Sequence, residues 1–222
     1  APTAIATHVN SLVRDNAHEL LGQDETQQLL DKIGDKYPKL VSGLVPDLLP
    51  LATVAQVLQN LLEEQVPVKD MRNIIDALTL HAADTKEPNE LTGLIRPRLG
   101  RQIVQPLLDD DDTLNVITLS PDLERLLESS KAAGGGDQIT LEPSLAQNMI
   151  NNLSNEVEKI LNGGTPVSLV VSPSLRLWLS KFTRMRVPDL VVLSYGEIPD
   201  DLNIQVRSSI GSDPLINSQS EA

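Results

Sequence analysis

Apolar residues recur at helical spacing through the first hundred residues of the chain. The stripes, in which apolar positions repeat every three or four residues, cover residues 7–21, 24–33, 51–65, 71–80 and 88–103. Between the second and third stripes the breakers predict only short turns; they are Pro38, Gly43, Pro46 and Pro50. Pro97 lies inside the last stripe, so we expect it to kink that helix or shift its boundary. The first half of the chain is therefore predicted to be all-helical.

The ends of the first two helices carry recognisable signals. Thr7 can cap the first helix with its hydroxyl, and Gly22 can end it. Asp24 with Gln27 three residues later resembles a capping box that opens the second helix.

The pattern changes after residue 112. Three β-type runs, at residues 116–119, 139–141 and 169–171, each lead through a polar residue into a proline. The polar residues, predicted as N-caps, are Ser120, Glu142 and Ser172. The prolines, predicted at the first helical position where a missing N–H costs nothing, are Pro121, Pro143 and Pro173. Two more β-rich runs follow at 190–194 and 204–210, so strands alternating with helices predict βαβ units and a partly parallel sheet.

These patterns predict a mixed α+β or α/β chain with two domains. A helical domain should extend to residue 108, and a smaller α/β domain should cover residues 109–211. The acidic run 109–112 repels itself, so we interpret it as an exposed linker between them. Gly134 to Gly136 is interpreted as a flexible link, and residues 212–222 as a disordered tail.

Composition narrows the functional classes. The 222 residues carry a formal charge of −13, divided as −4 over residues 1–108 and −9 over residues 109–222. This charge disfavours nucleic acid and anionic membrane surfaces, because both are themselves negative. Without cysteine the chain has no disulfide framework and no thiolate metal site. It begins Ala-Pro-Thr and shows no apolar run of about 18 residues, so we expect a soluble fragment of a longer protein.

Candidate chemistry is sparse. His8, His18 and His81 lack the spacing of a metal pair and are interpreted as surface or helix-end residues, so no metal site is expected. The glycine run at 134–136 is not followed by Lys-Ser or Lys-Thr and is not a P-loop. We therefore expect neither an enzyme nor a cofactor. One enzymatic alternative stays open, because the helix starts at Ser120 or Ser172 could hold an anion.

Two further features suggest binding. The helix pair at 51–83 suggests a winged-helix regulatory binder, although its second helix presents a balanced face rather than a basic one. A basic cluster on one predicted helix comprises Arg176, Lys181, Arg184 and Arg186. It is either a solvated helix face or a landing site for an acidic partner or a neighbouring subunit.

Several stretches together resemble one family over almost the whole chain. They are residues 6–10 (ATHVN), 17–22 (AHELLG), 26–31 (TQQLLD), 38–40 (PKL), 57–64 (VLQNLLEE), 66–72 (VPVKDMR) and 193–199 (LSYGEIP). The chain resembles the C-terminal cytoplasmic region of the FHIPEP family, the large membrane component of the flagellar type III export gate, with relatives in injectisomes. The ending at 193–199 looks more flagellar than injectisome.

The resemblance carries several expectations. It implies that residues 1–22 complete an upstream subdomain, that 23–108 and 109–211 are the third and fourth subdomains, and that the missing N-terminal region alone enters the bacterial inner membrane. It implies a nine-membered ring on the cytoplasmic face that receives flagellar chaperone–cargo complexes, export ATPase components and other gate subunits. It also places Thr7 at the edge of a chaperone-binding dimple. The family implies no catalytic activity.

Overall fold

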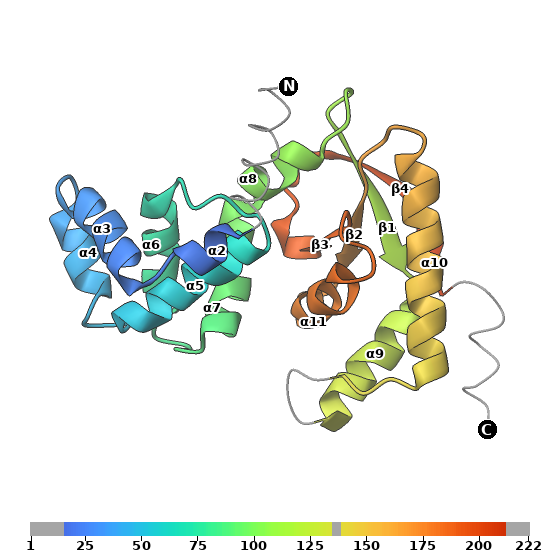
Figure 1. Cartoon of the computed structure of the whole chain (residues 1–222), viewed down its shortest axis with the longest axis horizontal. Helices are drawn as coiled ribbons and strands as arrows, with labels where there is room; N and C mark the ends of the chain where they lie inside the picture. Colours follow the sequence, from blue (N-terminus) through green and yellow to red (C-terminus); the bar gives the residue numbers. More distant parts are fainter. Residues whose placement is uncertain (1–15, 135–138, 212–222) are drawn as a thin grey trace. The chain divides into compact units, whose positions relative to one another are not determined.

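The computed structural model describes residues 16–134 and 139–211 (Figure 1). The chain divides into two compact units, residues 1–103 and 104–222. The boundary lies five residues before the position expected from the acidic run, and the α/β unit is the longer of the two rather than the smaller. The predicted fold class, an all-helical part followed by an α/β part, is confirmed.

The helical unit is built around α5 (Leu51–Glu63), its fourth described helix. Its elements are α2 (Ala17–Leu20), α3 (Gln23–Gly34), α4 (Pro38–Leu44), α5 (Leu51–Glu63), α6 (Met71–His81), α7 (Pro88–Ile95), the 3₁₀ turn η1 (Arg96–Leu99) and α8 (Gly100–Val104). Helix α5 packs against α2, α3 and α7, and it buries the apolar stripe predicted from the sequence. Leu58 and Leu61 are fully buried in this core.

Local signals in the helical unit are partly confirmed. Helix α7 gives way to a 3₁₀ turn at Arg96 and Pro97, as the proline predicts. The capping box of α3 uses Glu25 rather than Asp24 and Gln27, because the Gly22 N–H donates to Glu25 Oε2 at 2.9 Å. The prediction of turns alone between residues 38 and 50 was wrong, since Pro38 occupies the first turn of α4, where proline is well tolerated.

The α/β unit holds a parallel sheet. Its elements are η2 (Gln105–Leu107), β1 (Thr113–Leu119), α9 (Pro121–Gly134), α10 (Pro143–Leu161), β2 (Ser168–Val171), α11 (Pro173–Arg184), β3 (Val191–Ser194), η3 (Tyr195–Glu197) and β4 (Asn203–Ile210). Within the described residues the sheet has four strands in the order β3-β2-β1-β4, and every neighbouring pair is parallel. The sheet is therefore wholly parallel, where the sequence predicted a partly parallel one.

Three helices and one face of the sheet enclose the core of this unit. Helices α9, α10 and α11 each begin at the predicted proline. Their apolar residues, including Leu127, Leu153 and Leu179, form one buried cluster with alternate residues of the strands, including Leu169 and Val171. Residues 139–141 were predicted to form a strand and do not; Ile139 and Leu141 instead pack against the hydrophobic core from the connection between α9 and α10.

The acidic run is an ordered turn and not the predicted linker. The Asp109 carboxylate accepts hydrogen bonds from the N–H groups of Asp111 (3.0 Å) and Thr113 (2.9 Å). It also accepts one from the Asn115 side chain at 2.8 Å, and Arg207 Nε donates to Asn115 Oδ1 at 2.6 Å. The turn therefore belongs to the α/β unit, where it leads directly into β1.

Candidate interaction surfaces

The predicted basic cluster is split by the structure. Lys181 and Arg186 are exposed and Arg184 is half-buried, but Arg176 is only 3% exposed. Helix α11 ends at Arg184, so Arg186 lies two residues beyond it. Met185, between these cations, is 90% exposed. The surface at this helix end therefore consists of Lys181, Arg184, Met185 and Arg186. The sequence predicted the three charges but not the exposed apolar residue, Met185.

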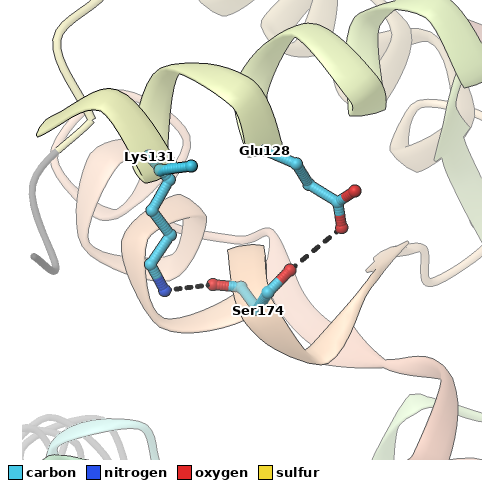
Figure 2. Close-up of a pocket in the computed structure, with 4 residues that line it drawn as sticks. Glu128, Lys131 and Ser174 are labelled. Carbon is cyan, nitrogen blue, oxygen red and sulfur yellow. Dashed lines mark hydrogen bonds between the residues drawn. The ribbon is translucent and has the colours of Figure 1, made fainter. Parts of the chain in front are cut away.

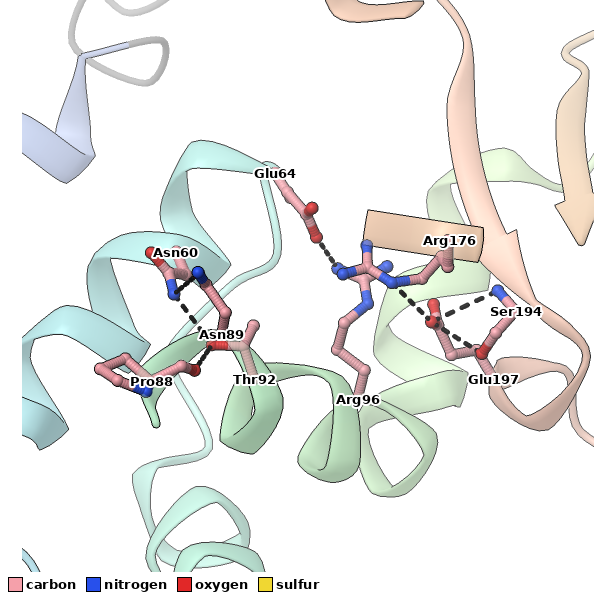
Figure 3. A network of polar contacts seen from close by, with 9 residues as sticks. All are labelled: Asn60, Glu64, Pro88, Asn89, Thr92, Arg96, Arg176, Ser194 and Glu197. Carbon is pink, nitrogen blue, oxygen red and sulfur yellow. Dashed lines mark hydrogen bonds and ion pairs between the residues drawn. The ribbon is translucent and has the colours of Figure 1, made fainter. Parts of the chain in front are cut away.

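Arg176 holds together the interior of the α/β unit instead of serving a partner. Its Nε lies 3.6 Å from Glu197 Oε1, and the Glu197 side chain is 1% exposed. Glu197 Oε1 also accepts hydrogen bonds from the N–H (3.3 Å) and the hydroxyl (3.0 Å) of Ser194 (Figure 3). The expectation that Arg176 lies on an exposed binding face was wrong, because its charge is needed by a buried carboxylate.

Thr7, the other predicted partner-binding residue, lies outside the described residues, as does His8. His81 ends α6, where its Nδ1 lies 3.6 Å from Asp84 Oδ2. Within the described residues, no three His, Asp or Glu side chains gather closely enough to hold a metal ion.

The start of α11 at Ser172 is filled by carboxylates from α9. Glu124 Oε1 accepts from the Ser172 N–H at 2.8 Å, and Glu128 Oε1 accepts from the hydroxyls of Ser172 (2.9 Å) and Ser174 (3.0 Å). Lys131 Nζ donates to the Ser174 carbonyl at 2.7 Å (Figure 2). An open hollow of about 520 Å³ is lined by Glu128, Lys131, Ala132 and Ser174. The donors that an external anion would need, the Ser172 N–H and the hydroxyls of Ser172 and Ser174, already bond to the protein's own carboxylates.

Tyr195 completes this group. Its hydroxyl donates to Glu124 Oε2 at 3.3 Å. Burial, together with the neighbouring Glu124 carboxylate, raises the pKa of the Tyr195 hydroxyl above its usual value. Tyr195 therefore stays a neutral donor to Glu124 at physiological pH. No local sequence pattern signals this contact, since it joins residues 71 positions apart.

The start of α9 at Ser120 is closed by the end of β4. Ser120 Oγ accepts from the Leu123 N–H at 3.3 Å, which confirms it as the N-cap, and the Ser120 N–H donates to the Ile210 carbonyl at 2.7 Å. Gly211 follows with φ of +90°, and a Cβ there would lie 2.7 Å from Ser120 Oγ. In parallel sheets, ligands favour the crevice where the strand order reverses, here between β1 and β4. That crevice is packed by the chain itself.

The helix pair α5–α6 uses its polar groups internally. Asp70 caps α6 by accepting from the Asn73 N–H at 3.2 Å and from the Asn73 amide at 2.7 Å. The Arg72 guanidinium lies 4.8 Å from the centre of the Tyr37 ring, a cation–π contact. In a DNA-binding protein the side chains of this helix would contact the bases. Here Arg72 and Asn73 instead make contacts within the helical unit.

A second polar network joins α5 and the residue after it to α7 and η1 of the helical unit. Asn60 Nδ2 donates to Asn89 Oδ1 (3.2 Å) and to Thr92 Oγ1 (3.1 Å), and the Thr92 hydroxyl donates to the Pro88 carbonyl at 2.7 Å (Figure 3). The buried Arg96 forms an ion pair with Glu64. These contacts fix α7 and η1 against the end of α5, so this network has a structural role.

Comparison with known proteins identifies the family. The FHIPEP family model matches residues 1–203. The chain belongs to the FHIPEP family. The flagellar biosynthesis protein FlhA of Escherichia coli K12 is 42% identical over 211 residues, which are 95% of this chain and 30% of that protein. The resemblance seen in the sequence motifs is thereby confirmed, and the chain spans less than a third of this relative.

Solved structures of type III secretion proteins share the fold. The nonameric SctV-C of enteropathogenic E. coli (EPEC) superposes with a TM-score of 0.83 at 26% identity and covers 93% of this chain and 62% of its own. A Chlamydia pneumoniae CdsV protein, solved in complex with CdsO, superposes with a TM-score of 0.79 at 25% identity. The match covers 91% of this chain and 58% of the CdsV chain. Within residues 16–134 and 139–211, no helix is long and apolar enough to cross a bilayer.

Proposed function

We propose that this chain is a docking and ring-forming module of the flagellar type III export gate. It lies on the cytoplasmic face of the bacterial inner membrane, where it receives chaperone–cargo complexes and soluble export components such as those of the ATPase complex. The observation that carries the proposal is the FHIPEP membership over residues 1–203, together with the fold shared with nonameric SctV-C. The complex of CdsV with CdsO supports a soluble partner.

The arrangement of polar groups in the α/β unit supports binding rather than chemistry. Its helix starts at Ser120 and Ser172, which are the positions where an α/β enzyme would hold an anionic substrate, are packed or filled by the chain itself. Its cations at Lys181 and Arg186 are exposed at a helix end. We propose that the module presents rigid surfaces to other proteins and performs no bond-making step.

Calorimetry with purified flagellar chaperone–cargo pairs tests this function. The complete cytoplasmic region, of which this chain is part, should bind at least one pair and should form higher oligomers. A complete region that binds none of the pairs would count heavily against the proposal. Turnover of a small molecule that a single side-chain change abolishes would overturn the non-enzymatic part.

The winged-helix alternative finds no support. Residues 16–103 contain helices and 3₁₀ turns but no strand, so the described part of the helical unit has no wing. Arg72 and Asn73 on α6 are engaged as described above. A gel shift with duplex DNA at physiological salt should accordingly show no complex.

A further inference from the structure

The edge at which the parallel strands begin, here called the amino edge, carries opposite charges at its two ends. The basic end lies beside β3 and consists of Lys181, Arg184, Met185 and Arg186, at the close of α11. The acidic end lies before β1 and β4 and consists of Asp110, Asp111, Asp112, Asp200 and Asp201, all of them exposed. The α/β unit is thus polarised along this edge.

The strand order keeps the two ends apart. Helix α11 packs against β2 and β3, and the order β3-β2-β1-β4 places β3 and β4 at opposite sides of the sheet (Figure 1). Two strand spacings of about 4.8 Å put roughly 10 Å between β3 and β1, which the acidic turn precedes, and a third spacing puts roughly 14 Å between β3 and β4. Both separations exceed the Debye length of about 8 Å at physiological salt, so the opposite charges of one copy are largely screened from each other.

Each end also presents apolar surface. At the basic end, Met185 is 90% exposed. At the acidic end, Ile204 and Val206 are 49% and 59% exposed, and they share one face of β4 because they are two residues apart. Strand β4 pairs with β1 on one side and has no second neighbour among the described residues. Both ends therefore combine charge with an apolar anchor, which is the composition of a protein-binding surface.

We propose that the basic end of one copy of this chain docks against the acidic end of the next copy. Met185 would lie against Ile204 and Val206, while Lys181 and Arg186 face Asp110 and Asp111. Because two different surfaces meet, the contact is heterologous, and repetition of such contacts generates rings when the rotation closes. This inference rests on the proposed function, and it names the surfaces by which the α/β units of neighbouring copies would meet.

A second copy fits the basic end better than an unrelated acidic partner does. The complementary charges and the complementary apolar residues are both present in the same unit. Copies with a charge of −13 repel each other at long range, so association requires a place where opposite charges meet. The two ends of the amino edge provide that place.

Two charge-reversed variants of the whole chain test the docking. The first, Lys181→Glu with Arg186→Glu, makes both ends of its edge acidic. The second, Asp110→Lys with Asp111→Lys, makes both ends basic. It keeps the turn because Asp111 contributes its backbone N–H and carbonyl to the turn's hydrogen bonds, and not its side chain. Sedimentation velocity at about 20 mM and about 300 mM salt measures self-association, since screening separates charge-driven contacts from others.

The wild type should associate at low salt and dissociate at high salt. Each variant alone should associate at least about tenfold more weakly, because like charges then meet. An equimolar mixture should recover association, because acidic ends of one variant meet basic ends of the other. The control, Arg125→Glu with Lys36→Glu, changes the net charge by as much as the first variant at exposed cations outside both ends, and should behave as wild type.

Three results would overturn the docking: a wild type that stays monomeric, single variants that associate normally, or a mixture without recovery. Circular dichroism melting confirms that each variant is folded. The fate of the proposed function is read separately from chaperone–cargo calorimetry. If the mixture recovers association but no chaperone–cargo pair binds, the docking is supported and the proposed function is contradicted. If a pair binds but the mixture does not recover association, the proposed function is supported and the docking is contradicted.

Discussion

The two edges of the parallel sheet differ in how their polar groups are used. At the edge where the strands end, each polar group described has an internal partner: Ser172 faces Glu124 and Glu128, and Ser194 with Arg176 surrounds Glu197. At the amino edge, by contrast, Lys181, Arg186 and the aspartates stand exposed. The edge that usually carries active sites in α/β folds is closed, and the opposite edge is open to partners.

This contrast separates a shared architecture from a shared activity. A parallel sheet whose helices begin at its carboxyl edge offers N–H groups to anions in many enzymes. Here the start of α11 is occupied by carboxylates of α9, which supports the proposal that the sheet is a rigid support. Changes at the closed edge should therefore cost stability, whereas changes at the amino edge should alter association and leave stability almost unchanged.

The largest loss should follow from Arg176→Met at the closed edge. It leaves the buried Glu197 carboxylate without its ion-pair partner, which costs about 3–5 kcal/mol in the free energy of unfolding. Urea unfolding followed by Trp178 fluorescence measures this, because Trp178, the only tryptophan, lies in α11 of the same unit. The control Lys181→Met, exposed on the same helix, should stay within about 0.5 kcal/mol. A loss below about 1 kcal/mol for Arg176→Met would show that the buried pair is not needed.

Gly211→Ala should destabilise the same unit by about 3 kcal/mol. The new Cβ would lie 2.7 Å from Ser120 Oγ and 2.9 Å from Leu123 Cβ, and the backbone is left-handed with φ of +90°. Gly164→Ala is a matched control, since its φ is +78° but its Cβ meets open space; it should lose only about 1–2 kcal/mol. Equal losses in the two variants, measured by the same unfolding curves, would mean that the crevice between β1 and β4 is not tightly packed.

A smaller effect is expected when the anions that fill the start of α11 are removed. Glu124→Gln with Glu128→Gln should cost about 1 kcal/mol, because the positive end of the helix loses both charges. The Ser172 N–H and the hydroxyls of Ser172 and Ser174 should then be able to donate to an external anion, so phosphate should raise the melting temperature of the variant but not of the wild type. Matched chloride solutions control for ionic strength. Phosphate stabilisation of the wild type itself would contradict the closed edge and revive an anion-binding role.

The smallest effect concerns the acidic turn at the amino edge. The hydrogen bond from Asn115, with those from the backbone N–H groups of Thr113 and Asp111, holds the pKa of the Asp109 carboxyl below its usual value. The unfolded chain therefore binds this proton more readily than the native state does. The resulting stability is present above the usual aspartate pKa of about 3.9 and is lost as the pH falls toward the lowered value.

Asp109→Asn should remove this dependence. The melting temperature of the wild type should fall more steeply than that of the variant between about pH 5 and pH 3. Asp110→Asn, next to it in the turn, serves as the control for loss of a charge alone. Parallel slopes for the wild type and Asp109→Asn would show that the turn gains nothing from the ionised carboxyl.

Local signals in the sequence foretold most of the fold. The prolines at 121, 143 and 173 mark helix starts because their own ring geometry favours that position. Signals that depend on distant partners failed. Residues 139–141 are strand-like, but Ile139 and Leu141 pack against the core from a connection between helices. The acidic run is ordered because Asn115 and backbone N–H groups satisfy Asp109.

The interaction surfaces were predictable only in part. The charges of Lys181, Arg184 and Arg186 follow from sequence, but the burial of Arg176 does not, because its partner Glu197 belongs to a segment that comes together with α11 only in the folded unit. The exposure of Met185 does not follow from sequence, because a methionine at helical spacing usually lies in a core. The complementarity of the two ends needed the strand order, which no local pattern reveals.

The position of β4 also bears on how the protein is made. Strand β1, the first described strand of the unit to be synthesised, pairs with β2 on one side and on the other with β4, which comes last in sequence among the described strands. Until β4 has left the ribosome, that flank of β1 has no native neighbour. A nascent chain stalled before Asn203 should therefore be a target for chaperones and proteases, and synthesis of β4 becomes the step that covers β1.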